Sequence, residues 1–265
     1  MFDSNSYSLD NLAPVVGEVA RAAGHAILEV YERADTVQVI AKADNSPVTE
    51  ADFASNTVIC AALAELEPFM PIISEENKAI PFEERSKYPA FWLVDPLDGT
   101  KEFLKRNGEF TVNIALVRGN TPVLGVVYAP VTDDLYVGYE QTAYVEKGGE
   151  KTKIQVPAFS LRDSRLTVVC SRSHLNEATR QYLASLNEPT TLSVGSSLKF
   201  LMVANGRAHI YPRLGPTSEW DTAAAQAVVE AAGGQVLEAE TGTPLRYNKE
   251  ELLNPYFIVY GQVRD

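Results

Sequence analysis

The chain has 265 residues, which is long for one simple domain and short for two complete ones, so we expect one compact body with two lobes. Hydrophobic residues make up 45% of the sequence, which is ordinary for a globular protein with a sizeable core. The 23 Lys and Arg residues face 35 Asp and Glu residues, and the net charge of −12 argues against broad binding of nucleic acid polymers or anionic membranes.

Cysteine usage and the N-terminal sequence favour a reducing compartment. Cys60 and Cys170 each lie in an apolar stretch and are expected to be buried thiols outside any disulfide framework. The N-terminal residues lack the basic and apolar regions of a signal peptide, and no apolar run approaches the length of a membrane span. We therefore expect a cytoplasmic protein, and peripheral membrane association through partners stays open.

The first half of the chain is predicted to contain two helices and a series of strands. Apolar residues at helical spacing predict a helix over 12–33. Thr49 is a good N-cap for a second helix. This second helix is expected to direct Phe53, Cys60 and Leu63 inward. Apolar segments bounded by turn dipeptides predict strands at 36–40, 71–74, 91–94, 110–117, 123–128, 135–139, 143–147 and 153–156.

The second half alternates between strands and helices. The expected strands are 166–170, 190–194, 208–211, 235–238 and 256–260. The expected helices are 174–186, a helix opened by 195–197 that ends at 204, and an alanine-rich helix over 222–232. Such alternation implies a layered α/β fold. We place the boundary between the lobes at 156–165, which gives a metal-binding N-terminal lobe at about 1–158 and a C-terminal α/β lobe at about 159–265.

Carboxylates follow the predicted strands at three places. Glu75 and Glu76 come after the strand 71–74, Asp95 and Asp98 come after 91–94, and Asp221 opens the alanine-rich helix. The ends of strands are where layered α/β proteins build their sites. Each place also has a purely structural explanation: a solvated loop for the glutamates, a turn for the aspartates, and a favourable helix-dipole position for Asp221.

The spacing of Asp95 and Asp98 suits magnesium. Pro96 fixes the turn between them, and such a turn can direct both carboxylates and the Leu97 carbonyl at one point. These are hard oxygen ligands of the kind that magnesium takes. The following amides of Gly99 and Thr100 could bind a phosphate group.

The chemistry that needs this set is the hydrolysis of a phosphate monoester. Its uncatalysed rate is among the slowest known, because the attacking water must lose a proton and the leaving oxygen must be stabilised. Two divalent ions held by carboxylates can do both. They would also neutralise a cluster of carboxylates that would otherwise repel the phosphate, which explains how an acidic chain could bind such a substrate.

Other chemistries find less support in the sequence. Aspartyl-phosphate enzymes of the haloacid dehalogenase type need two aspartates two residues apart, whereas Asp95 and Asp98 are three apart. His25, His174 and His209 are scattered without metal-ligand spacing and are expected to be structural. The sequence has no phosphate-binding G-x-x-x-x-G-K-[ST] loop and no G-x-G-x-x-G after a strand.

Four blocks in this order resemble the inositol monophosphatase family of magnesium-dependent, lithium-sensitive phosphatases. They are the segments 46–52, 74–76, 92–100 and 220–224. The resemblance implies a layered αβαβα sandwich. Lys101-Glu102-Phe103 and the segment 195–200 are most similar to the 3′(2′),5′-bisphosphate nucleotidase branch, which implies hydrolysis of 3′-phosphoadenosine 5′-phosphate to AMP in sulfate assimilation.

The resemblance also implies roles for individual residues. The first magnesium would bind Glu75, Asp95 and the Leu97 carbonyl, and the second would bind Asp95, Asp98 and Asp221. Glu75 and Thr100 would orient the attacking water. Asp52 and Glu76 would serve a third metal or its surroundings, although Asp52 could equally cap the second helix with Thr49. The substrate would contact Asp98, Gly99, Thr100, Lys101, Ser196, Ser197, Lys199, Arg213 and Asp221.

Two other functions and one residue stay open at this stage. The same metal site could serve an inositol or sugar monophosphatase. A metal-dependent sensor that binds a phosphorylated ligand without turnover is a different class, and the intact acidic set counts against it. Lys199 could bind a second phosphate or could be a solvated helix residue. The partner in either enzyme would be a small phosphorylated molecule, and the sequence does not give an oligomeric state.

Overall fold

The computed structural model describes residues 8–33, 39–41, 47–171 and 176–264. The helices are α1 (Leu9–Glu32), α2 (Glu50–Ala64), α3 (Phe82–Arg85), α4 (Thr100–Leu104), α5 (Glu177–Ala184), α6 (Leu198–Ala204) and α7 (Ala223–Ala231). No helix within the described residues combines the length and the apolar character that a membrane crossing requires.

The larger of the two main sheets has seven strands in the order β3-β4-β5-β6-β7-β8-β9. Its strands are β3 (Ile72–Ser74), β4 (Ala90–Asp98), β5 (Thr111–Arg118), β6 (Thr121–Ala129), β7 (Asp134–Tyr139), β8 (Thr142–Lys147) and β9 (Glu150–Lys153). Only the β3–β4 pair is parallel among these strands. Short antiparallel connections of this kind build a meander whose strands follow one another in sequence.

The smaller main sheet has five strands in the order β12-β11-β13-β15-β14. Its strands are β11 (Thr167–Cys170), β12 (Thr190–Ser193), β13 (Ile210–Arg213), β14 (Gln235–Glu238) and β15 (Phe257–Tyr260). Two additional strand pairs join β1 (Val39–Ala41) to β2 (Pro47–Thr49) and β10 (Ala158–Phe159) to β16 (Gln262–Val263).

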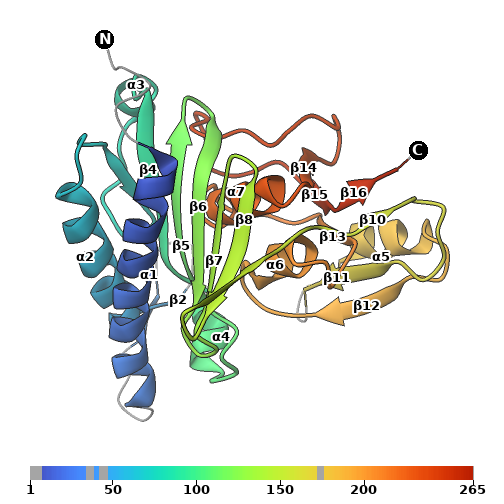
Figure 1. Cartoon of the computed structure of the whole chain (residues 1–265), viewed down its shortest axis with the longest axis horizontal. Helices are drawn as coiled ribbons and strands as arrows, with labels where there is room; N and C mark the ends of the chain where they lie inside the picture. The colour runs from blue at the N-terminus through green and yellow to red at the C-terminus, as the bar shows by residue number, and fades with distance from the viewer. Residues whose placement is uncertain (1–7, 34–38, 42–46, 172–175, 265) are drawn as a thin grey trace.

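The elements stack in five layers (Figure 1). Helices α1 and α2 cover one face of the seven-stranded sheet, and α6 and α7 lie between the two sheets. Helix α5 packs on the outer side of the five-stranded sheet. The predicted αβαβα sandwich is therefore confirmed.

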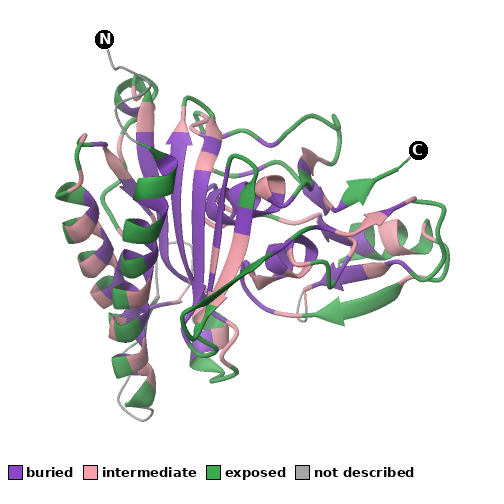
Figure 2. Ribbon diagram, viewed as in Figure 1, coloured by how far each residue is buried: buried purple, intermediate pink, exposed green. Residues whose placement is uncertain are grey.

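The central strands contribute side chains to two hydrophobic cores, one on each face of the sheet. In β4, Trp92 and Val94 point into the core under α1 and α2, whereas Phe91 and Leu93 point into the core under α6 and α7. Successive side chains of a strand point to opposite faces, so a continuous apolar run is the pattern of a strand covered on both sides. Figure 2 shows these middle strands as the most continuously buried part of the molecule.

Two glycines allow helix α7 to approach the seven-stranded sheet closely. Gly125 in β6 and Gly138 in β7 are paired across the two strands. A Cβ atom on Gly125 would lie 2.0 Å from the carbonyl oxygen of Ala224, and one on Gly138 would lie 2.4 Å from Cα of Val228. The backbone of α7 therefore occupies the space that any larger residue would need.

Several predicted elements have different bounds in the structure. The strand expected at 91–94 continues to Asp98, because β5 pairs with it as far as Thr111. The strand expected at 153–156 is instead β9 at Glu150–Lys153. There Gly148 and Gly149 adopt positive φ and return the chain at once to β8. Short elements such as α3, α4, β2, β10 and β16 were not predicted, because so few residues carry no clear periodicity.

The expected inward orientation of Phe53 is wrong. Its exposed fraction is 44%, because α2 buries the stripe at four-residue spacing formed by Ala51, Ser55, Ile59 and Leu63. Cys60 and Cys170 are both free; Cys170 is buried as expected, whereas Cys60 is only half-buried. Parts of the segments expected at 36–40 and 174–186, including His174, lie outside the described residues.

Candidate active site

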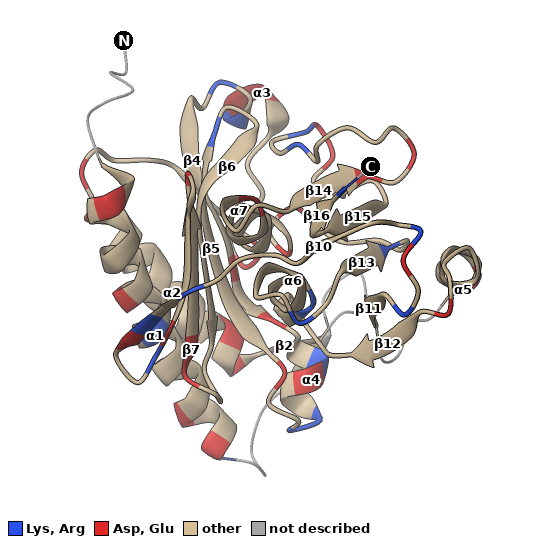
Figure 3. Cartoon of the chain, turned by 45° about the vertical axis from the view of Figure 1, so that its right-hand side comes forward, with Lys and Arg blue, Asp and Glu red and all other residues tan. Residues whose placement is uncertain are grey.

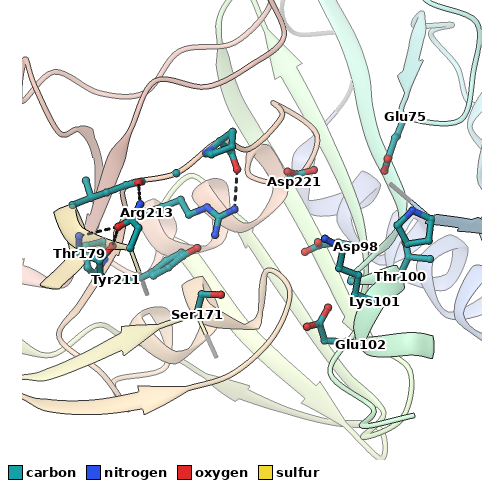
Figure 4. Close-up of a pocket in the computed structure, with 17 residues that line it drawn as sticks. Glu75, Asp98, Thr100, Lys101, Glu102, Ser171, Thr179, Tyr211, Arg213 and Asp221 are labelled. Atoms are coloured by element: carbon teal, nitrogen blue, oxygen red, sulfur yellow. Dashed lines mark hydrogen bonds between the residues drawn. The ribbon is translucent and has the colours of Figure 1, made fainter. Parts of the chain in front are cut away.

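A cleft of about 690 Å³ lies between the two sheets (Figure 4). One wall carries Glu75, Asp98, Thr100 and Lys101, and the opposite wall carries Tyr211 and Arg213. Asp221 lies between the two walls. A second recess of about 160 Å³ shares Asp98 and Arg213 with the cleft and continues to Lys199. The structure therefore brings most of the predicted site residues to one place.

The end of β4 positions the two central aspartates. Its pairing with β5 slips between Asp95 and Asp98, so the segment is a bulged strand end and not the separate turn that we expected. Asp95 has an exposed fraction of only 1%, and its Oδ1 accepts a hydrogen bond of 3.0 Å from the amide of Leu97. The Ser55 hydroxyl from α2 donates to the carbonyl of Pro96 at 2.7 Å and fixes the bulge.

Gly99 lets the chain leave the bulge and enter α4. Its φ of 97° is left-handed, a conformation that favours glycine. A Cβ atom there would lie 3.1 Å from the carbonyl oxygen of Glu109 and 3.3 Å from Cβ of Ser196. Thr100 then begins α4, and its Oγ1 lies 3.3 Å from Asp52 Oδ1 and 3.5 Å from the Leu97 carbonyl oxygen.

Asp52 has the structural role that was left open. Its Oδ2 accepts from the amide of Thr49 at 2.8 Å and from the Thr49 hydroxyl at 2.7 Å, which completes a capping box at the start of α2. Because its other oxygen reaches Thr100, the cap also connects α2 to the edge of the cleft.

Asp221 precedes α7 by two residues, so it does not begin that helix as we expected; Thr222 is the N-cap. Its Oδ2 accepts a hydrogen bond of 2.9 Å from the amide of Ser218. The neighbouring Glu219 is fully buried, accepts from the amides of Asn248 and Lys249 at 2.6 and 3.0 Å, and forms an ion pair with the Lys249 ammonium group. These bonds hold the turn that carries Asp221 against the cleft.

Burial and neighbouring carboxylates raise the pKa of Asp95 and of Asp221. Burial is the largest cause of the strongly raised pKa of Asp95, and the charges of Glu75, Asp98 and Asp221 raise it further. Burial and the charge of Asp98 raise the pKa of Asp221. Within the described residues no three Asp, Glu, His or Cys side chains already form a closed ligand cluster. The donor set, carboxylates that repel one another in a buried place, nevertheless fits a divalent cation.

Glu75 and Glu76 differ in their surroundings. Glu75 is half-buried, lines the cleft and belongs to the group of charges around Asp95. Glu76 is also half-buried but does not line the cleft, and its amide donates to the Ser74 hydroxyl at 3.4 Å. The expected outer position of Glu76 stays a prediction.

The predicted substrate-binding residues outside the acidic wall differ in exposure. Lys101 is exposed at the mouth of the cleft, and Arg213 lines both recesses and donates from Nη2 to the Pro216 carbonyl at 2.8 Å. Ser196 and Ser197 are buried, and both donate to Asp98. Their expected direct contact with substrate stays a prediction.

Lys199 is buried with an exposed fraction of 8%, so the alternative of a solvated helix residue is wrong. Burial lowers the pKa of its ammonium group to about 8, and the charge of Arg213 contributes in the same direction. The two cations therefore lie close enough to repel each other, which is the arrangement expected where an anion is bound.

The two described histidines, His25 and His209, do not belong to the lining of the cleft. His209 accepts at Nδ1 from the amide of Thr167 at 2.9 Å, and His25 lies exposed on α1. The sequence reasoning did miss residues that line or support the cleft, namely Glu102, Thr111, Asn113, Ser171 and Tyr211. Thr111 and Asn113 had a usable signal, because two polar residues in an apolar strand require buried partners.

Comparison with known proteins supports the predicted family. The profile of the inositol monophosphatase family matches residues 8–257. The 3′(2′),5′-bisphosphate nucleotidase CysQ of Escherichia coli O157:H7 is 52% identical over 246 residues, which cover 92% of this chain and 97% of that protein. The protein of the same name from Haemophilus influenzae is 36% identical and covers 92% of this chain and 90% of its own length. The predicted class of enzyme is therefore the class named for these relatives.

Solved structures agree with this assignment. CysQ from Bacteroides thetaiotaomicron superposes with a TM-score of 0.84 at 41% identity and covers 98% of this chain and all of that one. An inositol monophosphatase from Anabaena superposes with a TM-score of 0.71 at 27% identity, covering 96% of this chain and 91% of that one. Because sequence and structure both match over nearly the whole length, this chain belongs to the inositol monophosphatase family.

Proposed function

We propose that this chain is a magnesium-dependent phosphomonoesterase that converts 3′-phosphoadenosine 5′-phosphate to AMP and phosphate. The observation that carries the proposal is the buried Asp95 carboxylate together with its charged neighbours Glu75, Asp98 and Asp221, which line a cleft that also presents cations. Relatives that are named 3′(2′),5′-bisphosphate nucleotidases and share 50 to 52% of their aligned residues with this chain support the choice of substrate.

The residues of this chain have distinct tasks in the proposal. Asp95, Asp98, Asp221, Glu75 and the Leu97 carbonyl would hold magnesium. The bound ions would supply an activated water and charge stabilisation for the leaving oxygen. Glu75 and Thr100 would orient that water, and the amides of Gly99 and Thr100 would hold the phosphate to be removed. Asp52 would support Thr100 through the contact between Oδ1 and Oγ1.

The opposite side of the cleft would select the nucleotide. A bisphosphate has a second anionic group, and Lys199 and Arg213 lie within one connected space with the acidic wall. An inositol or sugar monophosphate has no second phosphate to bind these cations. Lys101 at the mouth would attract either substrate, so it should contribute to affinity more than to choice.

Phosphate release tests the proposal directly. The protein with magnesium should release phosphate faster from 3′-phosphoadenosine 5′-phosphate than from inositol 1-phosphate at equal concentration. Preference for the inositol ester would keep the metal site and overturn the nucleotide assignment. Binding without release from either compound would indicate the sensor, and full activity in high lithium would count against the lithium-sensitive mechanism implied by the family.

We propose a cytoplasmic location and a small-molecule partner on the same basis. The net charge of −12 opposes stable binding to nucleic acid polymers.

A further inference from the structure

The Asp98 carboxylate is held by the segment that leads into α6. Its Oδ2 accepts a hydrogen bond of 2.6 Å from the Ser196 hydroxyl and one of 2.5 Å from the Ser197 amide. Asp98 lies on the seven-stranded sheet side of the cleft, whereas Ser196 and Ser197 precede α6 and its buried Lys199. This carboxylate is therefore connected to the part of the chain that approaches the proposed second phosphate.

Behind these serines lies a buried polar pair on β5. The Thr111 hydroxyl lies 2.7 Å from the hydroxyl of Ser196 and 2.7 Å from that of Ser197. The side-chain amide of Asn113 contacts the Ser197 hydroxyl at 2.9 Å. Thr111 and Asn113 are both completely inaccessible to solvent. The polar groups of these side chains must therefore find their hydrogen-bond partners within the protein and not in bulk water.

Counting protons fixes the direction of this network. Four contacts of 2.6 to 2.9 Å run from Asp98 to Asn113, and a longer contact of 3.2 Å joins the Thr111 hydroxyl directly to the Asn113 side chain. The hydroxyls of Ser196, Thr111 and Ser197 supply only three protons. With the Asn113 carbonyl oxygen facing Ser197, even the four shorter contacts cannot all have a proton. In that orientation the Asn113 Nδ2 atom is also buried without a partner.

Exchanging the oxygen and nitrogen of the Asn113 side chain resolves both problems. Which end of an amide faces which neighbour is an assignment made from hydrogen bonding, since the two ends have nearly the same shape. In the exchanged orientation Nδ2 donates to Ser197 and supplies the missing proton. The exchange leaves the Asn113 carbonyl oxygen without a donor, but buried acceptors that lack donors are less rare in proteins than buried N–H groups without a partner.

We infer that Thr111 and Asn113 are positioning residues for the Asp98 carboxylate. The relay runs in one direction: Asn113 Nδ2 donates to Ser197, Ser197 to Thr111, Thr111 to Ser196, and Ser196 to Asp98 Oδ2. Both donors to this carboxylate, the relay and the Ser197 amide, end on Oδ2, so Oδ1 is the oxygen through which Asp98 would bind a cation. The inference rests on the proposed function, because it assigns these residues to the same magnesium site.

Backbone geometry around the serines supports a positioning role. Ser196 has a φ of 55°, a left-handed conformation that costs energy for a residue other than glycine and is found at functional sites. Gly195 next to it is in close contact with Glu109, where a Cβ atom would lie 3.0 Å from the Glu109 carbonyl oxygen. The Gly195 amide also donates to Glu109 Oε2 at 2.8 Å. The relay and these contacts together hold the strained turn against Asp98.

The test measures magnesium binding without substrate. Thr111→Val keeps the shape of the side chain and removes the hydroxyl in the middle of the relay, whereas Thr111→Ser keeps that hydroxyl. Thermal unfolding of the whole chain is followed over a magnesium series, and phosphate release gives the KM for magnesium and kcat separately. We expect magnesium affinity up to roughly tenfold weaker in Thr111→Val, the upper end of the effect of losing a hydrogen bond between neutral groups, and near normal in Thr111→Ser.

Two further variants keep the outcome clear. Thr121→Val removes a hydroxyl at the opposite end of the β5–β6 hairpin, where it accepts from Arg246, and should leave magnesium binding unchanged. Ser197→Ala interrupts the same relay but keeps the backbone amide that binds Asp98. If Thr111→Val does not fold, Ser197→Ala alone should weaken magnesium binding, and unchanged affinity would overturn the inference.

The two proposals fail in different ways. A wild-type protein that is neither stabilised by magnesium nor active on a phosphate ester would overturn the proposed function and the inference together. A wild-type protein that shows both properties, with a folded Thr111→Val variant of equal magnesium affinity, would overturn the inference alone.

Discussion

Asp95 shows how one residue can oppose folding and serve chemistry at the same time. It is almost completely buried among other carboxylates, and burial together with their charges raises its pKa far above the usual range. Without a cation this carboxylate costs stability. With magnesium it would be the ligand shared by both ions. The burial of this charge beside other carboxylates therefore explains both the lower stability of the metal-free protein and the binding of the ions.

Asp95→Asn therefore has two opposite expected effects. The rate of phosphate release should fall by roughly 10² to 10³-fold or more, the loss typical of one electrostatic group at a catalytic centre. The melting temperature in the presence of a chelator should rise, because a repelled charge is removed from the interior. Exposed Asp163→Asn is the control and should change neither quantity. Near-normal activity of Asp95→Asn in magnesium would refute the two-ion site.

Lys199 gives a prediction about pH. The pKa of its buried ammonium group is lowered to about 8, so the group is charged below that pH and becomes neutral as the pH rises through it. If it binds the second phosphate, the KM for the bisphosphate should increase above pH 8. Lys199→Gln should raise the KM at neutral pH and remove this dependence, whereas the KM for inositol 1-phosphate should respond little. A steep increase that survives in Lys199→Gln would assign the titration to another group.

At the level of elements, the sheet glycines control where Asp221 lies. The backbone of α7 occupies the space beside Gly125, and Asp221 stands two residues before this helix. A methyl group at this position meets backbone atoms, which cannot rotate away. A shift of α7 would therefore move Asp221 relative to Asp98 across the cleft.

Gly125→Ala should accordingly reduce stability and activity together. Overpacking of this kind typically costs about 1 to 3 kcal/mol, and we expect a clear drop in the denaturant midpoint and weaker magnesium binding. Gly17→Ala is a matched control, because the new methyl group in α1 would meet only the end of the flexible Leu135 side chain at 3.0 Å. A stable, fully active Gly125→Ala would show that α7 is held elsewhere.

Particular residues show how far sequence reasoning reaches. Most strands of the larger sheet were predictable, because apolar runs such as 91–94 and 110–117 are long and have turn residues between them. The polar strand β9 was not, because it has no such run. The bulge that carries Asp95 and Asp98 was not, because it depends on pairing with β5 far along the chain. The burial of Lys199 also escaped prediction, since a short helix such as α6 has no periodicity that separates its buried face from a solvated one.

At the level of the whole molecule, we propose that the two lobes form one cooperative unit. Helix α7 comes from the C-terminal half of the chain, yet it packs on strands β5, β6 and β7 of the larger sheet. Neither sheet can therefore lose its partner without exposing a core. The charges on both sides of the cleft, which Figure 3 shows near α4 and α6, add a second connection that depends on what is bound.

Calorimetry should therefore show one unfolding transition in which the calorimetric and van't Hoff enthalpies agree. Magnesium at about a hundred times its dissociation constant should raise the unfolding free energy by about 2.7 kcal/mol, since it binds only the folded state. Potassium chloride at equal ionic strength separates this effect from screening of the net charge. Two separate transitions would indicate lobes that fold independently and would contradict the single unit.

The two sheets also end in very different outer strands. Strand β9 is fully exposed and carries Lys151 and Lys153, charges that discourage another strand from adding to that edge. Strand β12 is just as exposed but reads Thr-Thr-Leu-Ser, with no charge and Leu192 open to solvent. At high concentration, molecules of this protein should therefore begin to self-associate through β12. Replacing one residue of β12 with lysine should reduce this aggregation during storage without changing the cleft.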